Sequence, residues 1–280
     1  MSGLSLPSLN VRNLLRKYNL HPSKGLGQNF LQDNLALQKI VRVAELKPAD
    51  TVLEIGPGFG SLTRYLALSA GTVIAVELDR KLFPALGEVL TPHKNVQLVQ
   101  GDILKIDPAG IISRPGYVVV ANIPYYITSA VIRHLLEADL APRRMVLTVQ
   151  KEVAERICAL DGAMNLLALS VQVYGTPTIE GIILAEAFTP APKVDSAILC
   201  IDIRPQPVIP ASKLDVFFLM IKAGFSQKRK TLRNSLSGGL RLSLADTEAM
   251  LVRAGIDPRR RAETLSLEEW GRLVLEYLPD

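Results

Sequence analysis

The stretch Glu54-Ile55-Gly56-Pro57-Gly58-Phe59-Gly60 lies between a short apolar run, Thr51 to Leu53, and a segment with helical spacing. This order predicts a strand that turns sharply into a helix. Glycines have no Cβ, so they permit both the sharp turn and close contact between the backbone and a ligand. Dinucleotide-binding turns carry G-x-G-x-x-G, whereas this stretch reads G-x-G-x-G after an acidic residue. We therefore expect a nucleoside-bearing cofactor without a pyrophosphate, although tight packing alone also explains such a turn.

From residue 51 onward, short β-branched runs alternate with helical patterns, which is typical of a parallel sheet covered by helices. The expected strands are Thr51–Ile55, Thr72–Glu77, Val96–Gln100, Tyr117–Ala121, Met145–Gln150, Thr178–Leu184 and Ala197–Ile203. The expected helices are Ser61–Ala70, Arg80–Leu90, Ser129–Ala138, Lys151–Ala159 and Leu166–Tyr174. The gap before the last strand is too short for a parallel crossover, so that strand is expected to be antiparallel. The pattern predicts an α/β protein with a Rossmann-like seven-stranded sheet.

A proline-rich segment follows the last predicted strand. Its three prolines, within residues 205–210, stiffen the backbone and indicate a linker. Beyond it the strand pattern stops, and Ser243 and Ser266 are expected to cap helices. The helices expected there are Leu214–Ala223, Lys228–Leu236, Leu244–Ala254 and Leu267–Tyr277. We predict an N-terminal segment over residues 1–33, a sheet domain over 34–204, the linker and a small all-α domain over 211–280.

Composition indicates an ordinary globular protein. The 280 residues are 48% hydrophobic, which is enough for a buried core. No apolar run reaches the roughly 18 residues of a membrane span, and the N-terminus lacks the pattern of a signal peptide, so a cytoplasmic protein is expected. Cys158 and Cys200 lie among apolar neighbours and are expected to be buried thiols. The three histidines are scattered without ligand spacing, so no metal is expected.

Basic residues are unevenly distributed in a chain of net charge +5. One run is Arg259 to Arg261, and the segment Lys222 to Arg233 holds a larger cluster. If that segment is helical, Lys222, Arg229 and Arg233 share one stripe that could follow phosphates. Such runs more often form a solvated protein surface. The cluster therefore has two interpretations, a solvated surface or a binding site for a polyanion.

Polar residues follow successive strands of the predicted sheet, at the edge where such folds bind ligands. Glu77 comes 21 residues after Gly56, the spacing at which an acidic residue accepts both hydroxyls of a ribose. Asp102 could accept a hydrogen bond from an adenine amino group while Ile103 packs on the ring. The alternatives are a surface acid for Glu77 and a turn-forming residue for Asp102.

The tetrapeptide Asn122-Ile123-Pro124-Tyr125 follows the fourth predicted strand and resembles the NPPY-type loop of enzymes that methylate exocyclic amino groups. The lone pair of adenine N6 is delocalised into the ring, which makes the amine a poor nucleophile. Hydrogen bonds accepted from it by the Asn122 side chain and the Ile123 carbonyl would localise that lone pair. Pro124 would fix the turn, and Tyr125 would stack on a base splayed out of its helix or loop. The plainer reading is a proline turn with a packing tyrosine.

Several motifs together resemble the KsgA/Dim1 family of rRNA adenine N6,N6-dimethyltransferases, in its bacterial KsgA type, over roughly Lys24 to Leu278. They are Gly27-Gln28-Asn29-Phe30-Leu31, Glu54 to Gly60, Asn122 to Tyr125, Phe188-Thr189-Pro190-Ala191-Pro192-Lys193-Val194-Asp195-Ser196 and Phe225-Ser226-Gln227-Lys228-Arg229-Lys230. No motif position departs from the family pattern. Such a series of motifs in order is more specific than any one of them.

The resemblance implies S-adenosylmethionine as the cofactor, a lid within residues 1–33 and an RNA-binding role for residues 211–280. The cofactor-binding residues it implies are Gln28, Asn29, Leu31, Gly56, Gly58, Glu77, Leu78, Asp102, Ile103 and Asn122. The implied catalytic residues are Asn122, Ile123, Pro124, Tyr125 and Phe188, with Phe188 and Tyr125 enclosing the target base. The implied RNA-binding residues are Lys222, Lys228, Arg229, Lys230 and Arg233.

The implied activity is dimethylation of N6 on two adjacent adenosines, in a hairpin near the 3′ end of small-subunit (16S) rRNA, during ribosome biogenesis. The expected protein is a cytoplasmic monomer that acts on this RNA or on the immature small subunit, without a membrane. One rival is the related large-subunit rRNA methyltransferase that confers antibiotic resistance, and another is a non-catalytic ribosome-assembly factor. An NAD-linked oxidoreductase lacks the required glycine spacing.

Overall fold

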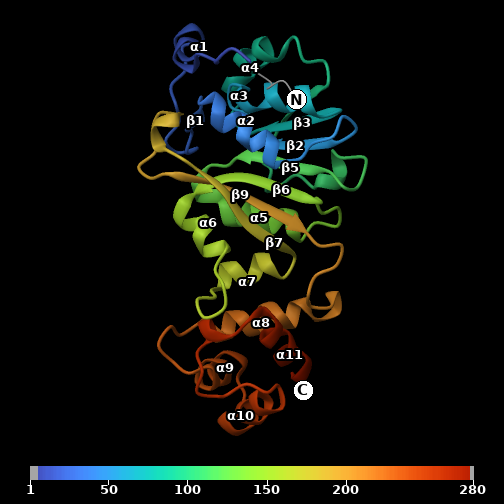
Figure 1. Cartoon of the computed structure of the whole chain (residues 1–280), viewed down its shortest axis with the longest axis vertical. Coiled ribbons are helices and arrows are strands. Elements are labelled where there is room, and N and C mark those ends of the chain that lie inside the picture. The colour runs from blue at the N-terminus through green and yellow to red at the C-terminus, as the bar shows by residue number, and fades with distance from the viewer. Residues whose placement is uncertain (1–5, 278–280) are drawn as a thin grey trace. The chain divides into compact units, whose positions relative to one another are not determined.

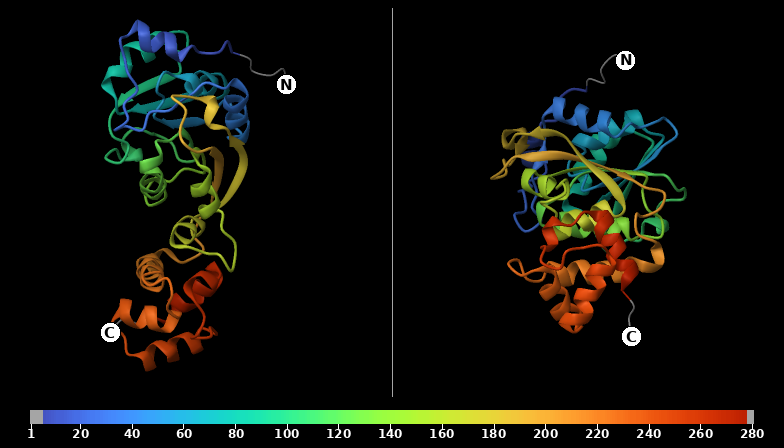
Figure 2. Two further views of the ribbon diagram at one scale, coloured as in Figure 1. Left: turned by 90° about the vertical axis from the view of Figure 1, so that its left-hand side faces the viewer. Right: turned by 60° about the horizontal axis from the view of Figure 1, so that its bottom comes forward.

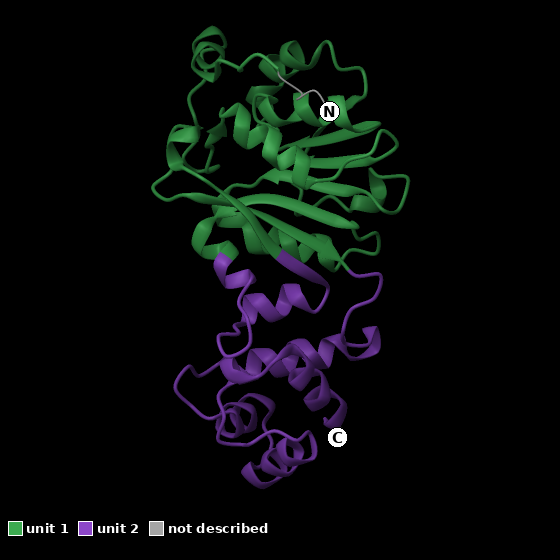
Figure 3. Cartoon of the chain, viewed as in Figure 1, with its two compact units in different colours: residues 1–154, 178–203 green, residues 155–177, 204–280 purple. Residues whose placement is uncertain are grey.

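The computed structural model describes residues 6–277. Residues 1–5 of the predicted N-terminal segment and 278–280 of the predicted helical domain lie outside the described residues. The chain divides into two compact units (Figure 3), one formed by residues up to 154 and 178–203 and the other by residues 155–177 and those from 204 onward. The second unit therefore includes residues 155–177, which the sequence assigned to the sheet domain. Its helix α7 (Leu166–Gln172) contacts α8 (Leu214–Gly224), which explains the difference.

The main sheet has seven strands in the order β4-β3-β2-β5-β6-β9-β7 (Figure 1). Their bounds are β2 (Thr51–Ile55), β3 (Thr72–Glu77), β4 (Val96–Gln100), β5 (Val118–Asn122), β6 (Arg144–Gln150), β7 (Gly175–Ile183) and β9 (Ser196–Ile203). Strands β4, β3, β2, β5 and β6 are mutually parallel, whereas β9 is antiparallel to β6. The predicted α/β class, the strands and the antiparallel last strand are confirmed.

The central strand β5 shows why the sequence folds this way. Val118, Val119 and Val120 are all fully buried, as expected for β-branched residues of a parallel strand covered on both faces. One face of the sheet packs against α2 (Asn34–Val43) and α3 (Ser61–Ser69), whose apolar residues join the same core cluster as Val118 and Val120. The parallel strands β2 to β5 end at one edge, so the polar residues after them meet there.

The other helices of the first unit agree with the predicted ones within a few residues. They are α4 (Phe83–Leu90), α5 (Thr128–Leu136) and α6 (Lys151–Ile157), the last of which continues into the second unit. The helix predicted from Arg80 begins instead with a separate 3₁₀ turn, Arg80–Leu82. The Asp79 side chain caps that turn by accepting from the Lys81 amide, and Pro84 occupies the first turn of α4.

The N-terminal part contributes an element that the sequence did not predict. After α1 (Val11–Lys17), the short strand β1 (Phe30–Leu31) pairs antiparallel with β8 (Phe188–Thr189). The pairing sets Leu31 opposite Phe188, so two motifs far apart in the sequence lie side by side. Two-residue strands carry no periodicity, and for this reason sequence patterns do not reveal them.

The second unit is helical (Figures 1 and 2). The fully buried Trp270 and Phe217 lie in its core. Its C-terminal helices are α8 (Leu214–Gly224), α9 (Leu232–Leu240), α10 (Leu244–Arg253) and α11 (Leu267–Glu276). Both predicted caps are confirmed: the Ser243 side chain accepts from the Asp246 amide, and Ser266 forms a capping box with Glu269.

The predicted helix Lys228–Leu236 is wrong in its boundaries. The chain turns between Phe225 and Thr231, and α9 begins only at Leu232. The reason is tertiary: a Cβ on Gly239 of α9 would lie 2.5 Å from the Cβ of Ala223, so the two helices approach closely and the chain must reverse between them. The predicted stripe of Lys222, Arg229 and Arg233 on one helix therefore does not exist.

Cys200 is buried as predicted, but Cys158 is only partly buried, and burial raises the pKa of each thiol to about 11. Within residues 6–277, no helix is long and apolar enough to cross a membrane.

Candidate functional site

The glycine turn after β2 adopts backbone conformations that explain its composition. Gly56, Gly58 and Gly60 have φ angles of 68°, 60° and 83°, a region that residues with a Cβ rarely occupy. A Cβ on Gly58 would also lie 2.9 Å from the Phe30 ring. The turn is therefore strained for other residue types and closely packed, and Gly60 leads directly into α3.

Glu77, at the end of β3, is 6% exposed and holds the glycine turn in place. Its Oε2 accepts a hydrogen bond of 3.1 Å from the Gly58 amide, and its Oε1 accepts one of 2.8 Å from the Asp79 amide. Burial raises the pKa of Glu77 above its ordinary value, while these two amides oppose that shift. A carboxylate fixed in this way keeps lone pairs for further donors, such as hydroxyl groups of a ligand.

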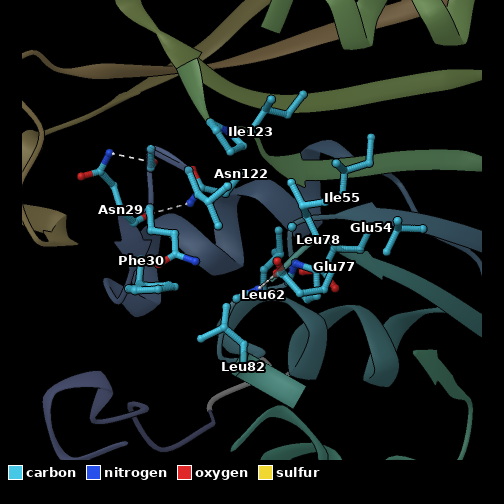
Figure 4. A pocket seen from close by; sticks show the side chains of 18 of the residues that line it. Asn29, Phe30, Glu54, Ile55, Leu62, Glu77, Leu78, Leu82, Asn122 and Ile123 are labelled. Atoms are coloured by element: carbon cyan, nitrogen blue, oxygen red, sulfur yellow. Dashed lines mark hydrogen bonds between the residues drawn. The ribbon is translucent and has the colours of Figure 1, made fainter. Parts of the chain in front are cut away.

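A pocket opens at the carboxyl edge of the sheet (Figure 4). It is lined by nearly all the residues predicted to bind the cofactor or to act in catalysis. Asn29, Phe30 and Asn122 lie on one side of the close-up view, and Glu77, Leu78 and Glu54 lie on the other. Together with the solvent-filled space at its opening, the pocket has a volume of about 1030 Å³. The predicted residues that line it are Gln28, Asn29, Leu31, Gly56, Gly58, Glu77, Leu78, Asp102, Ile103, Asn122, Ile123, Pro124 and Tyr125.

Asp102 and Ile103 follow β4, the third predicted strand, as expected. Ile103 is buried with 4% exposure and lines the pocket, so it offers an apolar surface. Asp102 is partly exposed, and its Oδ1 accepts a hydrogen bond of 3.1 Å from the Leu104 amide. This bond orients the carboxylate, as an Asx turn does. Among residues 6–277, Oδ2 has only the Lys105 ammonium nearby, at 3.9 Å.

Asn122 ends β5, and its side chain is oriented by the N-terminal segment. The Asn122 Nδ2 donates a hydrogen bond of 2.9 Å to the Asn29 carbonyl (Figure 4). This bond fixes which side of the amide carries oxygen. Among the described residues no group donates to Asn122 Oδ1, which is therefore available as an acceptor.

Tyr125 is half-buried, and its hydroxyl lies 2.7 Å from the Ser196 Oγ at the start of β9. Ser196 is fully buried, so this hydrogen bond fixes the Tyr125 ring at the pocket wall. Phe188 behaves differently from its predicted role. It is 3% exposed, belongs to the core beneath the sheet's helices and does not line the pocket, although its strand neighbour Leu31 does.

Sequence reasoning missed several residues of the pocket wall. Phe30 and Phe59 pack with ring centroids 4.7 Å apart, and Leu62 and Leu82 complete an apolar surface. Phe30 and Phe59 lie inside motifs already recognised, so their neighbours could have indicated them. Tyr126, also in the wall, is 62% exposed beside Gly27 and carries no separate sequence signal.

Glu54 is the most unusual of the missed residues. It is 1% exposed, lines the pocket, and its Oε2 has no hydrogen-bond partner among the described residues. Burial, with a smaller contribution from the charge of Glu77, raises the pKa of Glu54 to about 8. A buried carboxyl oxygen without a donor fits a ligand that brings its own cationic or hydrogen-bonding group, as the amino group of S-adenosylmethionine would.

The raised pKa of Glu54 predicts how pH affects the ligand-free protein. The folded state holds a proton between pH 4.5, the ordinary pKa, and about 8, whereas the unfolded state has lost it. Stability should therefore fall as pH rises through this window, by at most about 1.4 kcal/mol per pH unit from this group. Denaturant unfolding at several pH values should show a steeper decline for the wild type than for Glu54→Gln. Parallel curves for the two proteins would contradict the assignment.

The basic residues predicted to bind RNA lie in the second unit and differ in their surroundings. Lys222, Lys228, Arg229 and Lys230 form no ion pair within residues 6–277. Arg233, in contrast, pairs with Glu248 at 2.6 Å. The second basic run is also neutralised within the chain, because Arg259, Arg260 and Arg261 pair with Asp257, Glu269 and Glu263.

Comparisons with known proteins agree with this site. A family model described as "Ribosomal RNA adenine dimethylase" matches residues 20–278. "Ribosomal RNA small subunit methyltransferase A" of Dehalococcoides mccartyi (strain CBDB1) is 50% identical over 277 residues, covering 98% of this chain and 95% of that protein. The protein of the same name from Moorella thermoacetica is 45% identical over 271 residues, covering 93% and 94%.

Two solved structures share the fold over most of the chain. The 23S rRNA methyltransferase ErmE aligns with a TM-score of 0.73 and 32% identity, covering 89% of this chain and 99% of ErmE. A dimethyladenosine transferase from Plasmodium falciparum aligns with a TM-score of 0.75 and 26% identity, covering 88% and 96%. This chain belongs to the ribosomal RNA adenine dimethylase family and is an S-adenosylmethionine-dependent rRNA methyltransferase.

Proposed function

We propose that this protein transfers methyl groups to N6 of two adjacent adenosines, in a hairpin near the 3′ end of small-subunit rRNA. The substrate is small-subunit rRNA or the immature small subunit, and the protein acts as a cytoplasmic monomer. Relatives about half identical to this chain over nearly its full length are named for the small subunit, which supports this choice of RNA. The observation that carries the chemistry is the oriented amide of Asn122 at the mouth of the cofactor pocket.

In this proposal each pocket residue contacts a different group of the cofactor. Glu77 accepts from the ribose hydroxyls, Asp102 accepts from the adenine amino group, and Ile103 covers the ring. Asn29 and Leu31 of the lid close over the methionine part, and Glu54 faces its amino group from the sheet side of the pocket. The cofactor supplies a methyl group on a sulfonium, and the residues position the amine that receives it.

Asn122 and Ile123 prepare the acceptor. The Asn122 Oδ1 and the Ile123 carbonyl accept the two hydrogens of the N6 amine, which localises its lone pair toward the methyl group. Because Asn122 Nδ2 is already bound to the Asn29 carbonyl, the oxygen is oriented before the substrate arrives. No strong general base is needed, since the proton can pass to water after transfer.

The target base requires an aromatic partner on each face. Tyr125 is positioned for one face by its bond to Ser196. Phe188 can serve as the other only if it leaves the core, because it is 3% exposed. We therefore propose that RNA binding displaces Phe188 toward the pocket. Stacking of Phe188 on the target base, typically about 1 to 3 kcal/mol, would favour this displacement.

The unpaired cations of the second unit form the RNA-binding surface in this proposal. Lys222 and the cluster Lys228, Arg229 and Lys230 are free to meet phosphates, whereas Arg233 would first have to leave Glu248. The turn between α8 and α9 carries three cations in succession, and counterion release makes such contacts effective.

Labelled methyl transfer to unmethylated small subunits, large subunits and the naked RNAs tests the proposed function. We expect dimethyladenosine on two adjacent residues of the small-subunit RNA, and more on subunits than on naked RNA. Labelling of large subunits instead would favour the activity named for ErmE, which is 32% identical to this chain. Absence of labelling on every substrate, together with intact RNA binding, would support a non-catalytic assembly factor.

A further inference from the structure

The lid segment, residues 23–31, contacts several parts of the site at once. The Asn29 carbonyl orients Asn122, and Phe30 packs over Gly58. A Cβ on Gly27 would lie 3.3 Å from the Tyr126 ring, so the segment also contacts the loop that receives the target base. If this segment opened, the residues around the cofactor and the loop that receives the target base would both lose contacts.

The two ends of the lid segment are held differently. Its C-terminal end is paired through β1 with β8, and the Gln32 amide donates 2.9 Å to the Ala187 carbonyl. Its N-terminal end curls on itself, with the Gln28 amide donating to the Ser23 carbonyl at 3.2 Å. Helix α1, before this segment, is held to α4 by the Lys17 and Tyr18 side chains, which donate to the Glu88 carboxylate. Among the described residues, one hydrogen bond between side chains joins residues 23–28 themselves to the chain just after β3.

That bond runs from Gln28 Nε2 to Asp79 Oδ2 at 2.9 Å, between two half-buried side chains. The other atom of the Gln28 amide, Oε1, accepts from the Ser23 main chain at 2.8 Å. The Gln28 side chain therefore spans from the curled lid to the end of β3. A hydrogen bond to a carboxylate is stronger than one between neutral groups, which suits a single tie of this kind.

Asp79 also belongs to the ribose end of the site. Its amide donates to Glu77 Oε1, and its Oδ1 accepts from the Lys81 amide at 3.1 Å. The same residue thus holds the lid through one carboxylate oxygen, caps the following turn through the other, and orients Glu77 through its backbone. The position of the lid and the position of Glu77 share one anchor.

We propose that the Gln28–Asp79 hydrogen bond is a clasp that keeps the lid segment closed and slows the escape of the cofactor. Gln28 and Asp79 act as positioning residues, and the predicted direct contact of Gln28 with the cofactor is not required. The part concerning the cofactor rests on the proposed function. The closed state of the lid does not depend on the proposed function, because it can be measured without any ligand.

The chain offers a reciprocal test, since the donor and acceptor can be exchanged between the two positions. Gln28→Glu sets two carboxylates against each other but still accepts from Ser23. Asp79→Asn still accepts from Lys81 but turns an amide donor toward the Gln28 donor. In the double variant, the new amide at position 79 can donate to the new carboxylate at position 28, so the hydrogen bond is restored with its direction reversed.

Hydrogen exchange of the lid peptide in the ligand-free protein is the primary measurement. Each single variant should exchange about tenfold faster there, and the double variant should return to within about twofold of the wild type. The dissociation rate of S-adenosylmethionine should follow the same order. Gln32→Glu is the matched control, because it adds the same charge nearby to a side chain without a hydrogen bond among residues 6–277.

The outcomes separate the clasp from the proposed function. Equal exchange in all proteins, or a double variant as fast as the singles, would overturn the clasp. Equal thermal unfolding of the variants rules out a general loss of structure as the cause of faster exchange. If the wild type failed to bind S-adenosylmethionine while the exchange cycle held, the proposed function would fail and the clasp would stand.

Discussion

Asn122→Ala should reduce the methyl-transfer rate at saturating cofactor and RNA by about a hundredfold to a thousandfold, the usual effect of losing one preorganised group at a reacting centre. The reason is that Asn122 is held at the end of β5 with Nδ2 on the Asn29 carbonyl, leaving Oδ1 for the target amine. Single-turnover transfer of a labelled methyl group measures this rate without a contribution from product release.

The same variant separates chemistry from binding. RNA affinity should change by less than about threefold, because the basic residues lie in the other unit and Tyr125, the residue proposed to stack on the base, is retained. Hydrogen exchange of residues 27–31 is expected to rise modestly, since the Asn29 carbonyl loses its donor. Turnover equal to that of the wild type would show that Asn122 does not prepare the amine.

The triple variant Lys228→Gln, Arg229→Gln and Lys230→Gln should weaken RNA binding and lower its dependence on salt. Loss of three phosphate contacts should reduce the slope of log affinity against log salt by about two to three. Filter binding or anisotropy titrations at several salt concentrations measure the slope. The methyl-transfer rate at saturating RNA should change much less than the affinity.

A control with equal loss of charge is available in the same unit. Arg253, Arg259 and Arg261 are exposed but pair with Glu276, Asp257 and Glu263. Replacing these three with glutamine removes the same charge and should alter the salt slope by less than about one, because each is already neutralised. Similar slopes in the two triple variants would indicate a diffuse electrostatic effect, and an unchanged slope in the first would place the RNA surface elsewhere.

The strands and most helices could be predicted because their signals are local. Val118 to Val120 form a continuous β-branched run, and the glycines at 56, 58 and 60 allow a turn that other residues resist. Sheet topology then brings Glu77, Asp102 and Asn122 to one edge, so a correct set of strands already assembles most of the pocket.

The errors arose where contacts between distant residues override local preference. Lys228 to Thr231 have side chains compatible with a helix, yet the close approach of Gly239 to Ala223 requires a turn there. Phe188 follows the predicted strand Thr178–Leu184 and precedes a proline loop, and only the pairing of β1 with β8 sets it in the core opposite Leu31. Its role in stacking stays a prediction. Ion pairs such as Arg233 with Glu248 are equally invisible, because they join separate helices.

The chain itself determines the strands along the sequence, the glycine turn, the acidic residues at the end of β3 and after β4, and the asparagine loop, because periodicity and backbone conformation are properties of neighbouring residues. Folding determines the orientation of the Asn122 amide, the lack of a partner for Glu54 Oε2 among the described residues, the burial of Phe188 and the Gln28–Asp79 bond. Each arises between atoms far apart in sequence, whose distances are fixed only when the sheet and the lid segment have packed together.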